Sequence, residues 1–266
     1  MPASARAIDN LQEAAGTLSV SSVLCLPLGS TEQHGPHLPL DTDTVIAEAL
    51  TARIVARWGE AYDLWQLPVL PVGLSREHGW APGTVSHSVA AMTALLRDQA
   101  SAIVIAVPAR NLLIVNGHGG NRGILEAVGY ELHGDFGINL CSLHLGALFS
   151  PVPAHGLPEI HAGKDETSVM LAIAPGRVRR ERIADLRSPP DAAAVRATIL
   201  DPTVSWPWSS GDPRLADLGV IGDPHDSSAE HGEAIIERVI EAAGKILAQL
   251  RANQQTQHGG PAKIER

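Results

Sequence analysis

Short apolar runs, each followed by a polar loop or turn and then a helical pattern, are the feature that most constrains the fold of this chain. The runs cover residues 22–28, 111–115 and 138–143. They are continuous and too short for helices, as is typical of strands buried on both faces of a parallel sheet. Apolar residues recur at helical spacing over residues 44–58 and 123–132. The chain is therefore predicted to be an α/β protein.

Other segments extend this pattern. Residues 67–72 are predicted to form a short strand that Pro68 and Pro71 place at an edge or end early. Residues 177–219 show little periodicity, and their Trp206-Pro207-Trp208 is expected to line a pocket or, as is more common for such a pair, to pack at an interface. Three further helices are predicted, over residues 88–105, 167–173 and 229–250.

The 266 residues are 44% hydrophobic and 18% charged, which is the composition of a globular protein. No internal repeat and no linker divides them, so a single domain is predicted over residues 21–253. A polar lead-in, residues 1–20, precedes this domain. A polar tail, residues 254–266, follows it and is expected to be disordered.

Charge and apolar runs exclude several kinds of partner. The net charge of −9, without long charge blocks, argues against nucleic acid and against an anionic membrane surface. No apolar signal core begins the chain, and the longest apolar run, near residues 102–107, stops at Pro108. We therefore expect no membrane span and predict a cytoplasmic protein. Cys25 and Cys141 lie in predicted strands and are expected to be buried as small hydrophobic residues.

Residues 28–44 form a polar loop between the first strand and the first helix, where α/β proteins place functional sites. Glu32 and His34 are two residues apart, so in an extended segment their side chains point the same way. A carboxylate and an imidazole that converge suit a divalent metal ion. Asp43 could instead be the N-cap of the following helix, and His34 a solvated loop residue.

Three later segments carry side chains of the same kinds. The turn over residues 116–122 lacks the Lys and Ser/Thr of a P-loop and the G-x-G-x-x-G pattern of dinucleotide sites. Each segment could also be an ordinary loop, and Glu166 could simply complement a helix dipole. The residues in question are Ser75, Glu77 and His78 after the second strand, His118 and Gly119 after the third, and His161 and Glu166 after the fourth.

In a parallel sheet the carboxyl ends of the strands share one edge, so these groups can meet. Carboxylate and imidazole ligands without Cys favour Zn, Mn or Fe(II). A bridging Asp with flanking Glu and His would hold two ions, which activate a water and polarise a carbonyl, the chemistry of amide hydrolysis. A free His nearby could protonate the leaving nitrogen. A Ser-His-Asp hydrolase is less favoured because no G-x-S-x-G motif is present.

Residues 29–43, 116–121 and 161–168 resemble the creatininase (creatinine amidohydrolase) family, and the similarity runs from about Val23 to the last helix. The resemblance implies a three-layer α/β/α sandwich with a mainly parallel central sheet. It also implies a site for two divalent ions (Zn, Fe(II) or Mn) and a homo-oligomer, a hexamer or larger. Matched residue by residue, Glu32 and His118 correspond to ligands of one metal, His34 to a ligand of the other, Asp43 to the bridge, and His161 to the proton-transferring catalytic residue.

The chain departs from creatininase itself at two places. Gly120 stands where creatininase has a Glu that serves the second metal, and we predict that Glu166 takes this role. Leu157-Pro158 replace a Trp-Asp pair before the catalytic His, which argues against creatinine as the substrate. Substrate contacts are predicted for four residues: Ser75, Glu77, His78 and Gly119.

Four segments, residues 27–34, 73–84, 166–169 and 219–224, are most similar to family members that release a C-terminal Val-Tyr-derived unit from a modified ribosomal peptide. This implies a metal-dependent hydrolase acting on C–N bonds, with a modified peptide or a small amide as substrate. Two alternatives stay open. One is a cyclic-amide amidohydrolase or formamide deformylase on the same scaffold, and the other is a metal-binding oligomer without catalytic activity.

Overall fold

A four-stranded parallel sheet, in the order β2-β1-β3-β4, forms the centre of the molecule. The structure is a computed structural model that describes residues 18–151, 155–187 and 189–257. Three strands, β1 (Val23–Leu28), β3 (Asn111–Asn116) and β4 (Asn139–His144), lie where the apolar runs predict them. The predicted lead-in up to residue 17 and the end of the tail from residue 258 lie outside the described residues.

The remaining strand, β2, covers Leu64–Gln66 rather than the predicted residues 67–72. Pro68 and Pro71 have no N–H group and cannot donate to a ladder. The segment that contains these prolines therefore runs alongside β1 without forming a strand, and an isolated bridge joins Leu28 and Leu70. The edge position of this strand was predicted correctly, but its residues were not.

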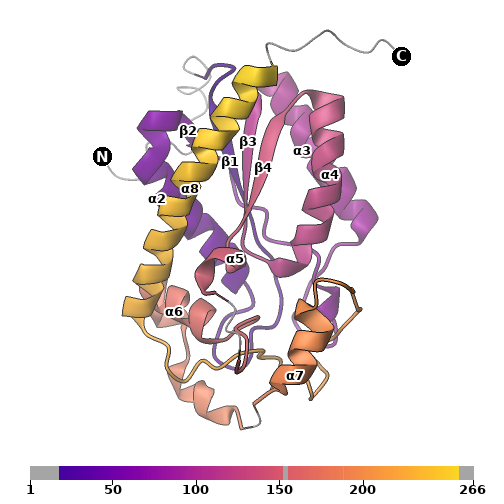
Figure 1. Cartoon of the computed structure of the whole chain (residues 1–266), viewed down its shortest axis with the longest axis vertical. Helices are drawn as coiled ribbons and strands as arrows, with labels where there is room; N and C mark the ends of the chain where they lie inside the picture. Colours follow the sequence, from indigo (N-terminus) through magenta and orange to yellow (C-terminus); the bar gives the residue numbers. More distant parts are fainter. Residues whose placement is uncertain (1–17, 152–154, 188, 258–266) are drawn as a thin grey trace.

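Helices cover both faces of the sheet (Figure 1). α2 (Thr42–Tyr62) and α8 (Ala229–Gln257) pack on one face, and α3 (Val89–Ala106) and α4 (Arg122–Phe136) pack on the other. The predicted α/β/α sandwich is thus confirmed. α8 runs beyond the predicted end at Leu250, into the segment expected to be disordered.

The residues of β1 show why two separate cores form. Val23 and Cys25 belong to the core that α2 and α8 cover, while Leu24 and Leu26 belong to the core under α3 and α4. Successive side chains of a strand point to opposite faces, so a strand between two helical layers must be apolar throughout. All of β1 is buried. This burial on both faces explains why the strand is a continuous apolar run in the sequence.

Shorter elements gather beyond the end of the sheet at which the strands finish (Figure 1). They are α5 (Gly146–Phe149), α6 (Lys164–Ile173) and α7 (Ala192–Val195). The region predicted to lack periodicity also contains a π-helix at Arg196–Leu200 and short 3₁₀ turns. These elements enclose the edge where functional residues are expected.

α3 differs from the expectation that no apolar segment approaches membrane-spanning length. It is long and apolar enough to cross a membrane by length and composition alone, although core helices of soluble proteins pass the same test. Met92 and Leu96 pack in the core, and Arg97 lies 2.8 Å from carboxylate oxygens of two α4 residues. The outer side is exposed, with Ile105 83% accessible.

The two cysteines are unpaired, as predicted. Cys25 is buried and Cys141 is half-buried, and burial raises the pKa of the Cys141 thiol to about 12. Burial also raises the pKa of the Cys25 thiol, with the nearby Cys141 adding to the shift. Both side chains therefore serve as small packing groups.

Candidate metal centre

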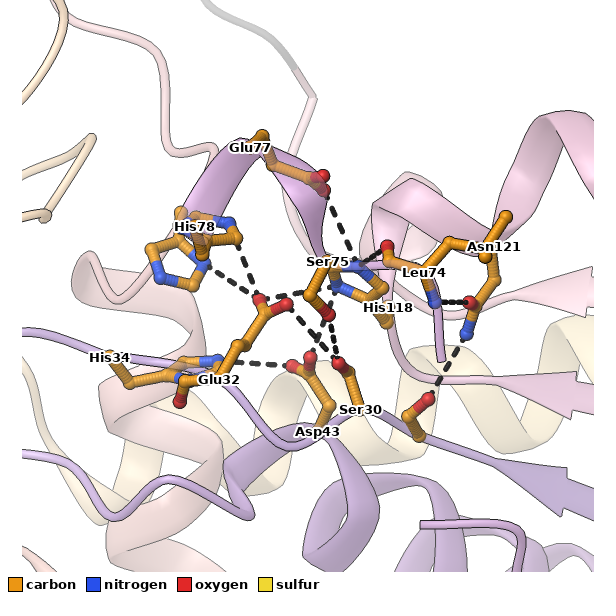
Figure 2. A network of polar contacts seen from close by, with 12 residues as sticks. Ser30, Glu32, His34, Asp43, Leu74, Ser75, Glu77, His78, His118 and Asn121 are labelled. Atoms are coloured by element: carbon orange, nitrogen blue, oxygen red, sulfur yellow. Dashed lines mark hydrogen bonds and ion pairs between the residues drawn. The ribbon is translucent and has the colours of Figure 1, made fainter. Parts of the chain in front are cut away.

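Buried carboxylates and imidazoles from separate parts of the chain meet at the carboxyl ends of β1 and β3 (Figure 2). Glu32 and His34 come from the loop after β1, Asp43 from the first turn of α2, and His118 from the turn after β3. Gly117 permits this approach, because a Cβ there would lie 2.5 Å from the backbone oxygen of Asp43. The predicted convergence at one edge of the sheet is observed.

Asp43 lies between two of the imidazoles. Its Oδ1 is 3.0 Å from His34 Nε2, and its Oδ2 is 3.1 Å from His118 Nδ1. Glu32 Oε1 is 3.2 Å from the same His118 nitrogen. Asp43 is not the N-cap of α2, a position held by Asp41. Its two oxygens therefore face two different groups of potential ligands, which is the arrangement of a bridging carboxylate.

Glu166 completes the group on the His34 side. Its Oε2 lies 4.0 Å from His34 Nε2 and accepts a 2.5 Å hydrogen bond from the backbone N–H of Ala162. Ala162 has φ of 54°, a left-handed conformation that is uncommon for Ala and typical of functional sites. One ligand atom each from His34, Asp43 and Glu166 lie within 4.8 Å of one another.

Two carboxylate oxygens in this cluster lack a hydrogen-bond partner within the described residues. They are Glu32 Oε1 and Asp43 Oδ2, and both are buried. His118 Nδ1 is close to both oxygens, but one nitrogen with one proton cannot form a good hydrogen bond to each of them, and a poorly satisfied buried charge is costly. A divalent cation would satisfy both oxygens, and an oxygen and nitrogen donor set without sulfur suits Zn or Mn. The residues present therefore fit a metal site.

The charge balance of the cluster leads to the same conclusion. Burial opposes a charge on His34, but the carboxylates of Asp43, Glu166 and Glu32 outweigh it and raise the pKa to about 10. The pKa of His118 likewise stands well above its ordinary value. Burial raises the pKa of Glu166 to about 7, although His34 opposes this shift. Without a cation, protons on the imidazoles neutralise the carboxylates; a metal ion would replace these protons.

His161 lies beside this cluster with one nitrogen already engaged. Its Nε2 is 2.7 Å from the backbone oxygen of Gln33, and its Nδ1 is 3.6 Å from Glu32 Oε1. Burial and the neighbouring His78 and His34 hold the pKa of His161 well below its ordinary value. The ring is therefore neutral, and donation from Nε2–H to Gln33 leaves a lone pair on Nδ1 facing the carboxylates. That atom could accept a proton, or bind an ion together with Glu32 and His34.

Glu77, predicted to contact substrate, lines the larger of two cavities at this site and also lies against His118. Its Oε1 is 3.4 Å from His118 Nε2, which is also 2.8 Å from the backbone oxygen of Leu74. A Cβ on Gly120 would lie only 2.5 Å from Glu77 Oε1 and from His118 Nε2. Glu77 thus fills the space beside Gly120, and Glu32, Glu77 and His118 form a further group of potential ligands.

The other three residues predicted to bind substrate occupy different positions. Ser75 is fully buried and hydrogen-bonds to Ser30, whose hydroxyl donates to Glu32 Oε2 at 3.2 Å. Ser75 therefore supports Glu32 from behind through Ser30, and its contact with substrate stays a prediction. His78 Nε2 lies 3.4 Å from Glu32 Oε1, and Gly119 lies at the open surface of the site.

Gln33 and Ser210 are parts of the site that were not predicted. Gln33 Nε2 lies 2.9 Å from His78 Nδ1, 3.1 Å from His161 Nε2 and 3.2 Å from Ser210 Oγ. The position of Gln33 between Glu32 and His34 was a usable signal. Ser210 gave none, because it lies in a segment without periodicity.

Two cavities meet at this cluster. One has a volume of about 390 Å³ and extends past Arg122, His144 and Glu159. The other has a volume of about 580 Å³ and extends past Trp206 and Trp208, so the tryptophan pair lines a pocket. Both cavities are lined by the same five residues: His118, Gly119, Ile160, His161 and Glu166.

Comparisons with known proteins place the chain in a family. Residues 10–247 match the profile of creatininase, creatinine amidohydrolase. A mycofactocin precursor peptide peptidase from Mycobacterium tuberculosis (strain CDC 1551 / Oshkosh) is 38% identical over 239 residues, which are 86% of each chain. A creatinine amidohydrolase from Pseudomonas putida is 27% identical over 245 residues, 85% of this chain and 88% of that one.

Solved structures agree in fold and in chemistry. A manganese creatininase superposes with a TM-score of 0.71 at 25% identity, covering 93% of this chain and 98% of that one. A creatininase mutant of the Zn-Zn type has a TM-score of 0.67 at 25% identity, covering 92% and 94%. Relatives of this fold thus carry Mn or Zn, and the chain has residue clusters able to hold such ions. The chain belongs to the creatininase family and is a metal-dependent hydrolase that acts on amide C–N bonds.

Proposed function

We propose that this hydrolase cleaves an amide bond in a modified peptide, releasing a C-terminal Val-Tyr-derived unit from a mycofactocin precursor peptide. The position of Asp43 between two ligand groups, with the neutral His161 beside them, carries the hydrolytic part of this proposal. The peptide part is supported by the 38% identical relative. Two cavities that meet at the cluster suit a substrate that extends to both sides of the cleaved bond.

Two divalent ions, of Zn, Fe(II) or Mn, would be held by this cluster. Glu32, His118 and Asp43 would bind one, and His34, Asp43 and Glu166 the other. The ions, when bound, supply Lewis acidity and lower the pKa of water. His161 Nδ1 would accept a proton from the water that adds to the amide and pass it to the leaving nitrogen, since Gln33 holds its other nitrogen.

The protein is further proposed to act in the cytoplasm as a homo-oligomer, a hexamer or larger. Two exposed apolar side chains at opposite ends of α3 support assembly, since Val89 is 62% and Ile105 is 83% exposed. Large exposed apolar side chains can mark places where another protein surface packs. Sedimentation of the wild type and of Ile105→Glu would test this, and a monomeric wild type would contradict it.

The test of function is turnover by protein reconstituted separately with Zn, Mn and Fe(II), followed by mass spectrometry. The substrates are the modified precursor peptide, creatinine and a formamide. We expect cleavage of the peptide alone, abolished by a chelator and by His34→Ala. Turnover of creatinine or the formamide without the peptide would favour a small-amide hydrolase. Metal binding without turnover of any substrate would favour a binding protein.

A further inference from the structure

Two tryptophans line the larger cavity and take no part in the chemistry described above. Trp206 and Trp208 are separated only by Pro207, in the segment that follows the π-helix. Side chains two residues apart can face the same side of a chain, and both indoles border the cavity of about 580 Å³. His118 and Glu166 border it too, so the tryptophans stand next to the metal centre.

Trp208 is held in a fixed orientation. It is half-buried and packs against a small apolar cluster that contains Val195, Leu215 and Ile221. Its ring meets His78 edge-on, with centroids 5.9 Å apart and planes at 90°. His78 in turn stacks on His161 at 4.1 Å. A continuous row of three rings therefore leads from the cavity wall to the reacting groups.

Trp206 shows the opposite environment. It is 57% exposed, and its indole makes no hydrogen bond and no ring contact with any residue that the structure describes. An exposed indole at the edge of a cavity offers a large apolar face at little cost in conformational freedom. Arg76 lines the same cavity, and a guanidinium adds affinity for an aromatic face.

We propose that this cavity binds an aromatic ring of the substrate, beside the amide that is cleaved. The ring would lie between Trp206 and the row formed by Trp208 and His78. The amide would lie at the residues that both cavities share, and the rest of the peptide in the cavity past Arg122. This assignment deepens, and rests on, the proposed function as an amide hydrolase. Indole and imidazole walls favour a flat ring over an aliphatic chain through edge-to-face and stacked contacts.

Binding tests the proposal without turnover. Ligand-observed NMR titrations of the metal-reconstituted protein would compare N-acetyl-tyrosinamide with N-acetyl-leucinamide. The aromatic amide should bind more tightly, and Trp206→Leu should weaken it about tenfold, whereas Trp206→Phe should restore most of the affinity. Trp208→Phe is a second variant of the cavity wall. It keeps a ring in the apolar cluster and should fold, so the wall can still be tested if Trp206→Leu does not fold. Tyr130→Leu is the matched control, since Tyr130 is 84% exposed on α4, away from the cavity.

Three results would overturn the proposal. The wild type could bind both amides equally, or Trp206→Leu could leave aromatic binding unchanged. The third is a changed subunit number in sedimentation of Trp206→Leu with unaltered ligand binding, which would assign the tryptophans to a subunit interface.

Kinetics separates this proposal from the proposed function. Peptides ending in Val-Tyr or Val-Leu after the cleaved bond should differ about tenfold in kcat/KM, and Trp206→Leu should remove that preference mainly through KM. Hydrolysis of both peptides at equal rates would contradict the aromatic site and leave the hydrolase standing. Ring binding that depends on Trp206, without hydrolysis of any peptide, would contradict the hydrolase and leave the aromatic site standing.

Discussion

The two sides of the larger cavity are built in different ways. The candidate metal centre stands mainly on loops that continue directly from β1 and β3. Its proposed ligands are buried or nearly so, and their polar atoms lie within about 3–4 Å of one another. The tryptophan wall stands on residues 204–209, which have no regular structure and are anchored by Ser210 and Trp208. Reacting groups need exact positions, which strands provide. A wall that selects substrates can lie on a segment that is free to vary between relatives.

The comparison predicts that a change on the strand-borne side abolishes chemistry. Asp43→Asn keeps the shape of the side chain but removes the charge that faces both His34 and His118. Activity should fall by about a thousandfold or more, because several kcal/mol of transition-state stabilisation depend on the ions. Metal content, measured by plasma mass spectrometry, should fall with it. An active, fully metallated Asp43→Asn protein would contradict the bridging role.

Lowering the pH should weaken metal binding at the metal centre and leave the tryptophan wall unchanged. The pKa of His34 is raised from 6.5 to about 10 in the metal-free fold. Its proton therefore stabilises that fold fully below pH 6.5, and this stabilisation is lost as the pH rises through 10. Metal binding must displace the proton, so affinity should rise with pH over this window by about tenfold per unit for each proton released. Calorimetry in buffers of different ionisation enthalpy would count the protons. A pH-independent affinity would be inconsistent with this charge balance.

Within the metal centre, two carboxylates are candidates for the metal ligand that creatininase has at the position of Gly120. Glu166 lies on the His34 side, whereas Glu77 lies behind His118. Glu166→Gln should reduce the bound ions from about two to one per chain. Glu77→Gln should keep the number of ions but weaken affinity about ten- to a hundredfold, as loss of a carboxylate that orients a ligating His does.

Equilibrium dialysis with Zn measures both quantities for these variants. Full metal content and activity in Glu166→Gln would refute its assignment as a ligand. A lower number of ions in Glu77→Gln would make Glu77 the ligand in its place.

The strand-borne side of the site could be predicted from the sequence, whereas most of the tryptophan wall could not. The strands and the groups at their ends were predictable, because β1 must be apolar on both faces and Glu32, His34 and His118 follow strands directly. The position of β2 was missed, because Leu64–Gln66 is a short strand beside a more apolar, proline-broken run. The roles of Ser210 and the tryptophans depend on how residues 177–219 pack against the site, which no periodicity reveals.

The smallest effect is expected from the anchor of the tryptophan wall. Ser210 Oγ lies 2.8 Å from both His78 Nδ1 and Trp80 Nε1. Ser210→Ala should lower the free energy of unfolding by about 1–3 kcal/mol, since the buried His78 and Gln33 each lose a hydrogen bond. KM should rise a few-fold as the wall loosens, while metal content and kcat stay near wild type. Ser209→Ala is the matched control, because among the residues that the structure describes its hydroxyl bonds locally, to the Gly211 N–H at 3.1 Å. If Ser210→Ala lost metal as Asp43→Asn should, the two sides of the cavity would be one cooperative unit, and the division between chemistry and selection would not hold.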